Sequence, residues 1–146
     1  MPYTPASDGV IQSVNAPNEI ERRLRVLVAD DHAMYRIAVQ QLVNTAPDLE
    51  VAGVARDGAE AWSMTIELNP DVVVLDGEMP IVSGIEVLSR LRTQVPRVRI
   101  VLNSSDPTVS EVGRRLGAEC VAKEAPPEIL LAAIRGFPVM VAASTD

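Results

Sequence analysis

Five polar side chains in this sequence stand at the ends of aliphatic runs, where a buried strand would emerge from the core. Asp30 and Asp31 follow RVLVA, Asp76 follows VVVL, Ser104 closes RIVLNS and Lys123 follows CVA. A carboxylate is costly to bury unless it is paired or bound to a metal. The aspartate after VVVL is therefore expected at a functional site and not inside a core.

Three carboxylates, a hydroxyl and an ammonium group on one rim would form an acidic pocket. Clustered carboxylates repel one another unless a cation neutralises them, and Mg²⁺ prefers such oxygen ligands. A metal beside a carboxylate, with Lys123 and Ser104 as donors, would hold the oxygens of a phosphoryl group. Asp76 is then the candidate nucleophile, which would form an acyl phosphate.

The elements that must position these side chains alternate between strand and helix. The run 72–75 is apolar without alternation, which is typical of a strand covered on both faces. We expect strands over 25–29, 48–55, 71–76, 99–102 and 120–122, and helices over 30–46, 58–68, 83–92, 107–116 and 127–137. Five β-α repeats predict a doubly wound α/β fold with a parallel sheet. Ligands of such sheets bind at the carboxyl ends of the strands.

Helix boundaries carry local signals. Asp30 or Asp31 is a good capping residue for the first helix, and Ser83 for the third. Apolar residues at a spacing of four are typical of a helix, and the first helix carries such a series: Met34, Ala38 and Leu42.

Composition limits the function classes. The chain has 146 residues, enough for one domain, with 47% apolar and 23% charged residues and a net charge of −7. That charge argues against a nucleic-acid surface, and no apolar run could span a bilayer. One cysteine and one histidine exclude an internal disulfide, make a zinc cage implausible and suit a reducing cytoplasm. We expect a mobile arm over 1–23, a domain over 24–137 and a tail over 138–146.

Several motifs together resemble the receiver domain of bacterial two-component response regulators. They are DDH at 30–32, VVVLDGEMP at 72–80 followed by SG at 83–84, and the lysine of VAKEAPPE. The stretches ADDHAMYRIAVQQLVNTAPDLEVAGVARDGAEAW and DGEMPIVSGIEVL are most similar to the NarL/FixJ subgroup. The resemblance covers about 24–137 and implies a flavodoxin-like (βα)5 fold with a five-stranded parallel sheet.

The resemblance also implies a role for each matching residue. Asp76 matches the phospho-acceptor, and Lys123 matches the lysine that pairs with the phosphoryl group. Asp30 and Asp31 match the acidic pair, in which Asp31 is the direct Mg²⁺ ligand, and the backbone carbonyl of Glu78 matches a further Mg²⁺ ligand. Ser104 matches the switch hydroxyl. Asn103 or Ser105 could take the switch position if the loop register slips. His32 is expected to be a surface residue at the start of a helix, not a phosphoryl donor.

Three features depart from the family pattern. The segment from Ser104 to Lys123 is short, and Pro107 and Gly113 weaken its helix. Cys120 stands three residues before the lysine, where the family usually carries an aromatic residue that swings inward. Glu78 adds a carboxylate beside the phosphorylation site, which we expect to alter dephosphorylation.

The leading interpretation is a cytoplasmic response regulator receiver that a histidine kinase or phosphotransfer protein phosphorylates and that switches contacts with a downstream protein. It would be no enzyme beyond its own phosphorylation and dephosphorylation. The alternatives are a pseudo-receiver scaffold that works without phosphorylation, a receiver fragment of a DNA-binding regulator and, remotely, a haloacid-dehalogenase-like phosphatase. A homodimer through 107–137 is an option, with an apolar surplus on the last helix: Ile129, Leu130, Ala133 and Ile134.

Overall fold

The computed structural model describes residues 22–137. The predicted arm, apart from its last two residues, and the predicted tail lie outside the described residues. The described elements are β3 (Leu24–Ala29), α2 (Ala33–Asn44), β4 (Leu49–Ala55), α3 (Gly58–Leu68), β5 (Val72–Asp76), α4 (Gly84–Gln94), β6 (Arg99–Ser104), α5 (Pro107–Arg115), β7 (Glu119–Ala122) and α6 (Pro127–Arg135). The predicted alternation of five strands and five helices is confirmed. None of the helices between residues 22 and 137 combines the length and apolar character that a membrane crossing requires.

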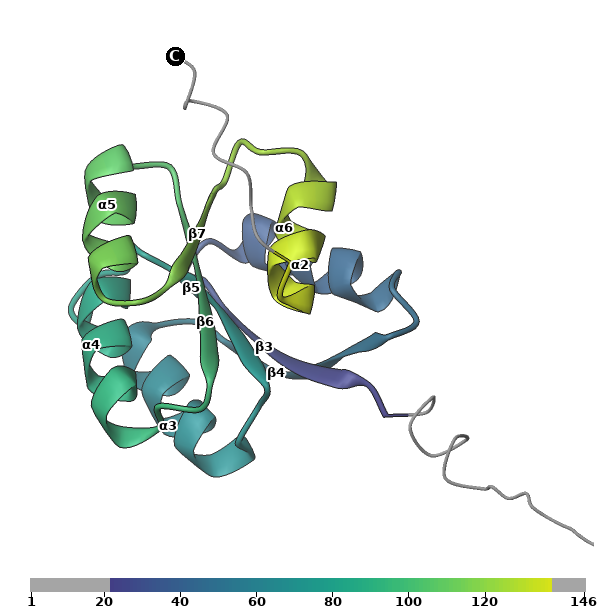
Figure 1. Cartoon of the computed structure of the whole chain (residues 1–146), viewed down its shortest axis with the longest axis horizontal. Coiled ribbons are helices and arrows are strands. Elements are labelled where there is room, and N and C mark those ends of the chain that lie inside the picture. The colour runs from purple at the N-terminus through teal and green to yellow at the C-terminus, as the bar shows by residue number, and fades with distance from the viewer. Residues whose placement is uncertain (1–21, 138–146) are drawn as a thin grey trace, which may run out of the picture.

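The five strands form one parallel sheet in the order β4-β3-β5-β6-β7. At its centre, Val74 pairs in register with Val28 of β3 and Val101 of β6. Helices α2 and α6 cover one face, and α3, α4 and α5 cover the other (Figure 1). The predicted doubly wound α/β fold is therefore confirmed.

The aliphatic run of β5 supplies two cores because successive strand residues point to opposite faces. Val73 and Leu75 lie in the core beneath α3, α4 and α5, whereas Val72 and Val74 lie in the core beneath α2 and α6. Full burial of each such side chain contributes roughly 1.5–3 kcal/mol. By the same alternation Asp76, two residues after Val74, is directed to the α2 and α6 side.

The start of α2 corrects one prediction. Neither Asp30 nor Asp31 caps this helix, because it begins at Ala33 and the N-cap residue, His32, makes no side-chain capping bond. The carboxylate of Asp30 instead accepts the N–H of His32 at 2.8 Å. By contrast, Ser83 caps α4 as predicted, since its Oγ accepts the N–H of Glu86.

The buried face of α2 is not the one that the spacing of four suggested. Val39 and Val43 are the residues of this helix that enter the core, whereas Met34 is 82% exposed. Two apolar series run along α2. The one that contains Val39 and Val43 packs against β3 and β4, and the one that begins at Met34 does not. The helix itself was predicted correctly.

The apolar surplus expected on α6 is mostly absent. Leu130, Ala133 and Ile134 are buried in the core, and only Ile129 of the four is exposed. The core therefore uses three of the residues on which the predicted homodimer depended.

Helix α5 is short, nine residues, and lies close to the sheet. A Cβ on Gly113 would stand 2.4 Å from Leu102 Cδ2 and 3.2 Å from Cys120 Sγ, and one on Gly77 would stand 2.6 Å from Val109 Cγ1. The buried thiol of Cys120 donates a hydrogen bond to the Ser110 carbonyl at 3.2 Å. Glycines at these contacts thus let α5 occupy the space beside the cysteine.

Candidate functional site

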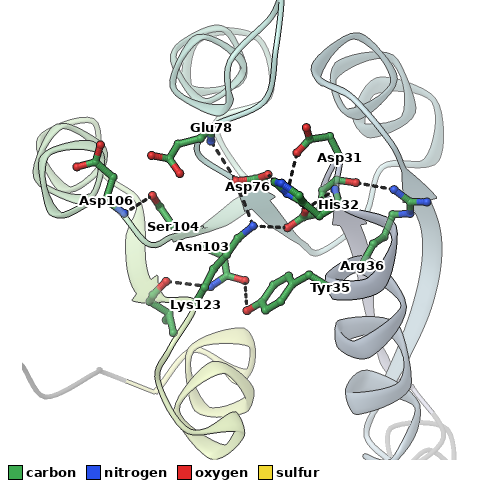
Figure 2. A network of polar contacts seen from close by, with 12 residues as sticks. Asp31, His32, Tyr35, Arg36, Asp76, Glu78, Asn103, Ser104, Asp106 and Lys123 are labelled. Atoms are coloured by element: carbon green, nitrogen blue, oxygen red, sulfur yellow. Dashed lines mark hydrogen bonds and ion pairs between the residues drawn. The ribbon is translucent and has the colours of Figure 1, made fainter.

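Four strands deliver the predicted site residues to one end of the sheet (Figure 2). Asp30 follows β3, Asp76 ends β5, Ser104 ends β6, and Lys123 follows β7. Asp30 and Asp76 are 3% and 1% exposed, so both carboxylates are removed from water. We call the three aspartates Asp30, Asp31 and Asp76 the acidic pocket.

Asp76 lies at the centre of the acidic pocket. Its Oδ1 accepts the backbone N–H of Glu78 at 3.0 Å, whereas its Oδ2 has no hydrogen-bond partner. Burial, followed by the charge of Asp30 and the carboxyl of Asp31, raises the pKa of Asp76 to about 6, against the opposing effects of the Glu78 N–H and Lys123. The pocket is therefore short of positive charge.

Lys123 is the cation of the site. Its Nζ lies 2.8 Å from Asp30 Oδ2 and 3.5 Å from Asp76 Oδ1, and 4.6 Å from the centre of the Tyr35 ring. Burial acts to lower the pKa of Lys123, but the hydrogen bond to Asp30 and the nearby carboxylates outweigh it and raise that pKa. The lysine is thus charged and directed at the phospho-acceptor candidate.

The acidic pocket suits a hard divalent cation. Asp31 Oδ1 and Asp76 Oδ2 are buried without a hydrogen-bond partner, and buried carboxylate oxygens normally have a partner or bind a metal. Ligand atoms of the three aspartates lie within 4.8 Å of one another. The donor set fits Mg²⁺. A ligand role for the Glu78 carbonyl stays a prediction.

Ser104 occupies the end of β6 and is 1% exposed. Its Oγ accepts the N–H of Asp106 at 3.0 Å. Of the two alternatives for the switch position, Ser105 is exposed and Asn103 is engaged elsewhere. Ser104 therefore remains the candidate switch hydroxyl.

Asn103 and Tyr35 form a bridge that the sequence analysis missed. Asn103 Oδ1 accepts the Tyr35 hydroxyl at 2.8 Å, and Asn103 Nδ2 donates to the Val121 carbonyl at 2.9 Å. The tyrosine ring held in this way lies against the ammonium of Lys123. A polar residue inside the run RIVLNS was the available signal.

His32 was expected to be a surface residue, and its side chain is indeed 67% exposed. Its Nδ1 nevertheless lies 3.2 Å from Asp31 Oδ1 and 3.4 Å from Asp30 Oδ1. The ring therefore borders the acidic pocket (Figure 2). The sequence analysis predicted the exposed position of His32 but missed this contact with the acidic pocket.

Comparisons with known proteins agree on one family. The sequence model of the response regulator receiver domain matches residues 26–135. A protein-glutamate methylesterase/protein-glutamine glutaminase of Thermotoga maritima is 42% identical over 85 residues, 58% of this chain and 24% of that protein. The nitrate/nitrite response regulator protein NarL of Escherichia coli is 37% identical over 114 residues, 75% of this chain and 52% of that protein.

Solved structures give the same answer. The response regulator domain of Thermotoga maritima CheB superposes with a TM-score of 0.73 at 34% identity, covering 78% of this chain and 95% of that one. The receiver domain of a putative NarL from Mycobacterium tuberculosis gives 0.71 at 28% identity, covering 79% and 98%. The matched region is only about a quarter of the length of the first curated relatives.

Proposed function

The chain belongs to the response regulator receiver domain family, and from that premise we propose that it accepts a phosphoryl group on Asp76 from a histidine kinase or phosphotransfer protein. The aspartyl phosphate would then switch contacts with a downstream protein. The observation that carries this proposal is the buried Asp76 carboxylate beside Lys123 Nζ at 3.5 Å and between two further aspartates.

In the proposed reaction, a carboxylate oxygen of Asp76 attacks the phosphorus of a phosphohistidine. The new O–P bond forms as the P–N bond breaks, and the imidazole leaves with the electron pair and takes up a proton. Lys123 neutralises charge on the transferred group and orients it. The products are an aspartyl phosphate on this chain and a free histidine on the donor.

Asp30, Asp31, Asp76 and the carbonyl of Glu78 would hold Mg²⁺, which supplies positive charge to the phosphoryl oxygens when it is bound. Asp30 also holds the lysine through the 2.8 Å ion pair. This chain's own chemistry is confined to gaining and losing one phosphoryl group.

The proposed switch uses Ser104. A phosphoryl group on Asp76 offers new acceptor oxygens, so the Ser104 hydroxyl would leave the Asp106 N–H and move toward them. Helix α5 follows directly, and its N-cap is Asp106. The readout is therefore proposed for α5, which packs against Cys120 of β7, the position where the family usually carries an aromatic residue.

Two alternatives make different predictions. A pseudo-receiver would keep the fold and take no phosphoryl group; the candidate acceptor Asp76, with Lys123, Ser104 and the acidic pocket around it, supports the phosphorylated alternative. A haloacid-dehalogenase-like phosphatase would carry its nucleophile on the first strand, whereas Asp76 ends β5, the third described strand. The third alternative, a receiver fragment of a DNA-binding regulator, would use the same site; NarL extends beyond the region matched here.

Phosphorylation by a small acyl phosphate donor tests the proposal. With Mg²⁺ present, we expect intact-protein mass to rise by about 80 Da, the mass of one phosphoryl group, and Asp76→Asn to abolish the gain. Glu67→Gln, on the exposed side of α3, is the charge-matched control and should be phosphorylated normally. No mass gain in the wild type would support the pseudo-receiver instead.

A further inference from the structure

The imidazole of His32 lies among the aspartates of the acidic pocket. Its Nδ1 lies 3.2 Å from Asp31 Oδ1, 3.4 Å from Asp30 Oδ1 and 4.0 Å from Asp76 Oδ2. One ligand atom from each of these four residues can be chosen so that all lie within 4.8 Å of one another. The nitrogen is thus placed as a further protein ligand beside the three carboxylates.

An independent observation favours a cation at this position. Asp76 is 1% exposed, and its Oδ2, which faces the imidazole, has no hydrogen-bond partner. A buried carboxylate oxygen in that condition is costly. A cation between Asp76 and His32 would satisfy this oxygen and would also offset the charge of the neighbouring carboxylates.

The distances agree with shared coordination. Around a six-coordinate ion with ligands at 2.0–2.1 Å, neighbouring ligand atoms are about 3 Å apart and opposite ones about 4 Å. The Nδ1 of His32 lies at about the neighbouring spacing from Asp31 and Asp30, and at about the opposite spacing from Asp76. Only small side-chain movements would complete such a site.

We propose that His32 is a metal ligand of the acidic pocket, which therefore takes divalent ions that favour imidazole nitrogen, such as Ni²⁺ and Co²⁺, in preference to Mg²⁺. Imidazole is a ligand for these ions, whereas Mg²⁺ favours oxygen donors. The inference rests on the proposed function only in sharing its metal pocket. It adds a protein ligand and an ion preference that the three aspartates alone would not give.

Calorimetric titration of the full chain, free of any histidine tag, tests the ion preference. His32→Phe keeps a ring and removes both nitrogens, and His32→Ala removes the ring. Both should fold because the side chain is 67% exposed and caps no helix. We expect Ni²⁺ affinity to fall at least about tenfold in both variants and Mg²⁺ affinity to change less than about twofold. Equal effects on the two ions would overturn the proposal.

Pulsed electron paramagnetic resonance of bound Mn²⁺ tests the ligand directly. His32 is the single histidine of the sequence, so an imidazole nitrogen coupling can have one source. We expect this coupling in the wild type and its loss in His32→Phe. A wild-type spectrum without it would overturn the proposal.

The two proposals can fail separately. The phosphorylation assay and the resonance measurement both use the wild-type chain, so each proposal has its own readout. Imidazole coupling in a wild-type chain that takes no phosphoryl group would leave the metal ligand standing and refute the proposed function. A wild-type chain that is phosphorylated but shows no imidazole coupling would support the proposed function and refute the metal ligand.

Discussion

The ammonium of Lys123 lies 2.8 Å from Asp30 Oδ2, so an ion pair joins the residues that follow the first and the last described strands. The same nitrogen is 3.5 Å from Asp76 Oδ1. Before any phosphoryl transfer the lysine is therefore bound to one carboxylate and within reach of the acceptor. The carboxylates of Asp30 and Asp76 and the ring of Tyr35 hold the lysine in this position. Phosphorylation therefore does not have to bring Lys123 to the acceptor.

Removing this cation should destabilise the fold. Lys123→Met keeps most of the stem and leaves Asp30 and Asp76 buried without a positive partner, which we expect to lower the free energy of unfolding by about 1–3 kcal/mol at neutral pH without divalent ions. Urea unfolding measures the change. Lys123→Arg keeps the charge and is the control. A Met variant as stable as the wild type would show that the pair contributes nothing net.

The raised pKa of Asp76 predicts that the stability difference between the wild type and Asp76→Asn depends on pH. This pKa is about 6 in the fold against 3.8 ordinarily, so the folded state binds the proton more tightly than the unfolded state does. Ionisation of Asp76 therefore costs stability: the penalty is absent below about pH 4, grows as pH rises to about 6 and is complete above it. Asp76→Asn should exceed the wild type in stability at pH 7 by about 1–3 kcal/mol in chelator.

Urea unfolding of both proteins at several pH values measures this difference, and a gap independent of pH would contradict the expectation. Added Mg²⁺ should stabilise the wild type more than Asp76→Asn, because an ion that binds the folded state raises the free energy of unfolding.

Much of the site could be predicted from the sequence because strand ends are readable from hydrophobic runs. Asp76 and Lys123 follow such runs, and parallel strands bring their carboxyl ends to one edge. The α/β fold followed from the same pattern and is confirmed, and so is the family that the resemblance of the motifs indicated. A residue placed by the backbone of a buried strand has little freedom to be elsewhere.

Residues on the helix facing the site could not be placed in the same way. The direction of His32 depends on the N-cap conformation, φ −93° and ψ 110°, and on carboxylates distant in sequence. The contact of Tyr35 with Asn103 joins residues 68 positions apart. For α2 the spacing of apolar residues allowed two faces, and the packing partners decided between them.

The loop after Asp76 contains a residue in an unfavourable conformation. Ile81 has φ of 69° and is fully exposed. A left-handed conformation costs a residue with a Cβ roughly 1–2 kcal/mol. Glycine avoids this cost, but it gives the unfolded chain more conformational freedom, which lowers stability by about 0.4–1 kcal/mol. We expect Ile81→Gly to raise the free energy of unfolding by about 0.5–1 kcal/mol. Ile81→Ala keeps the Cβ, so its free energy of unfolding should rise less. An equal rise in both variants would mean that the effect comes from removing an exposed apolar side chain and not from relieving the backbone conformation.

Restoring the family's aromatic residue should be unfavourable in this chain. Cys120 is 8% exposed, its thiol donates to the Ser110 carbonyl, and Gly113 packs against it. Because α5 fills this space, Cys120→Tyr would overpack it and should cost about 1–3 kcal/mol in the free energy of unfolding. Cys120→Ala removes the thiol without adding volume and should cost less. A tyrosine variant of wild-type stability would mean that α5 moves readily.

Glu78 places a carboxylate beside the acceptor, and its effect should appear in the lifetime of the phosphoryl group. The side chain is exposed, while its own N–H binds Asp76 Oδ1. A negative charge here opposes the approach of hydroxide and crowds the attacking water, so we expect dephosphorylation to be a few times faster in Glu78→Asn than in the wild type, a modest effect because exposed charges are screened.

The lifetime can be followed by intact-protein mass after removal of the phosphoryl donor. Glu78→Gln keeps the size and removes the charge, so it separates repulsion from crowding: a charge effect appears in both variants and shrinks in high salt, whereas a steric effect appears mainly in Glu78→Asn. Equal lifetimes in all three proteins would show that this carboxylate does not govern water attack on Asp76.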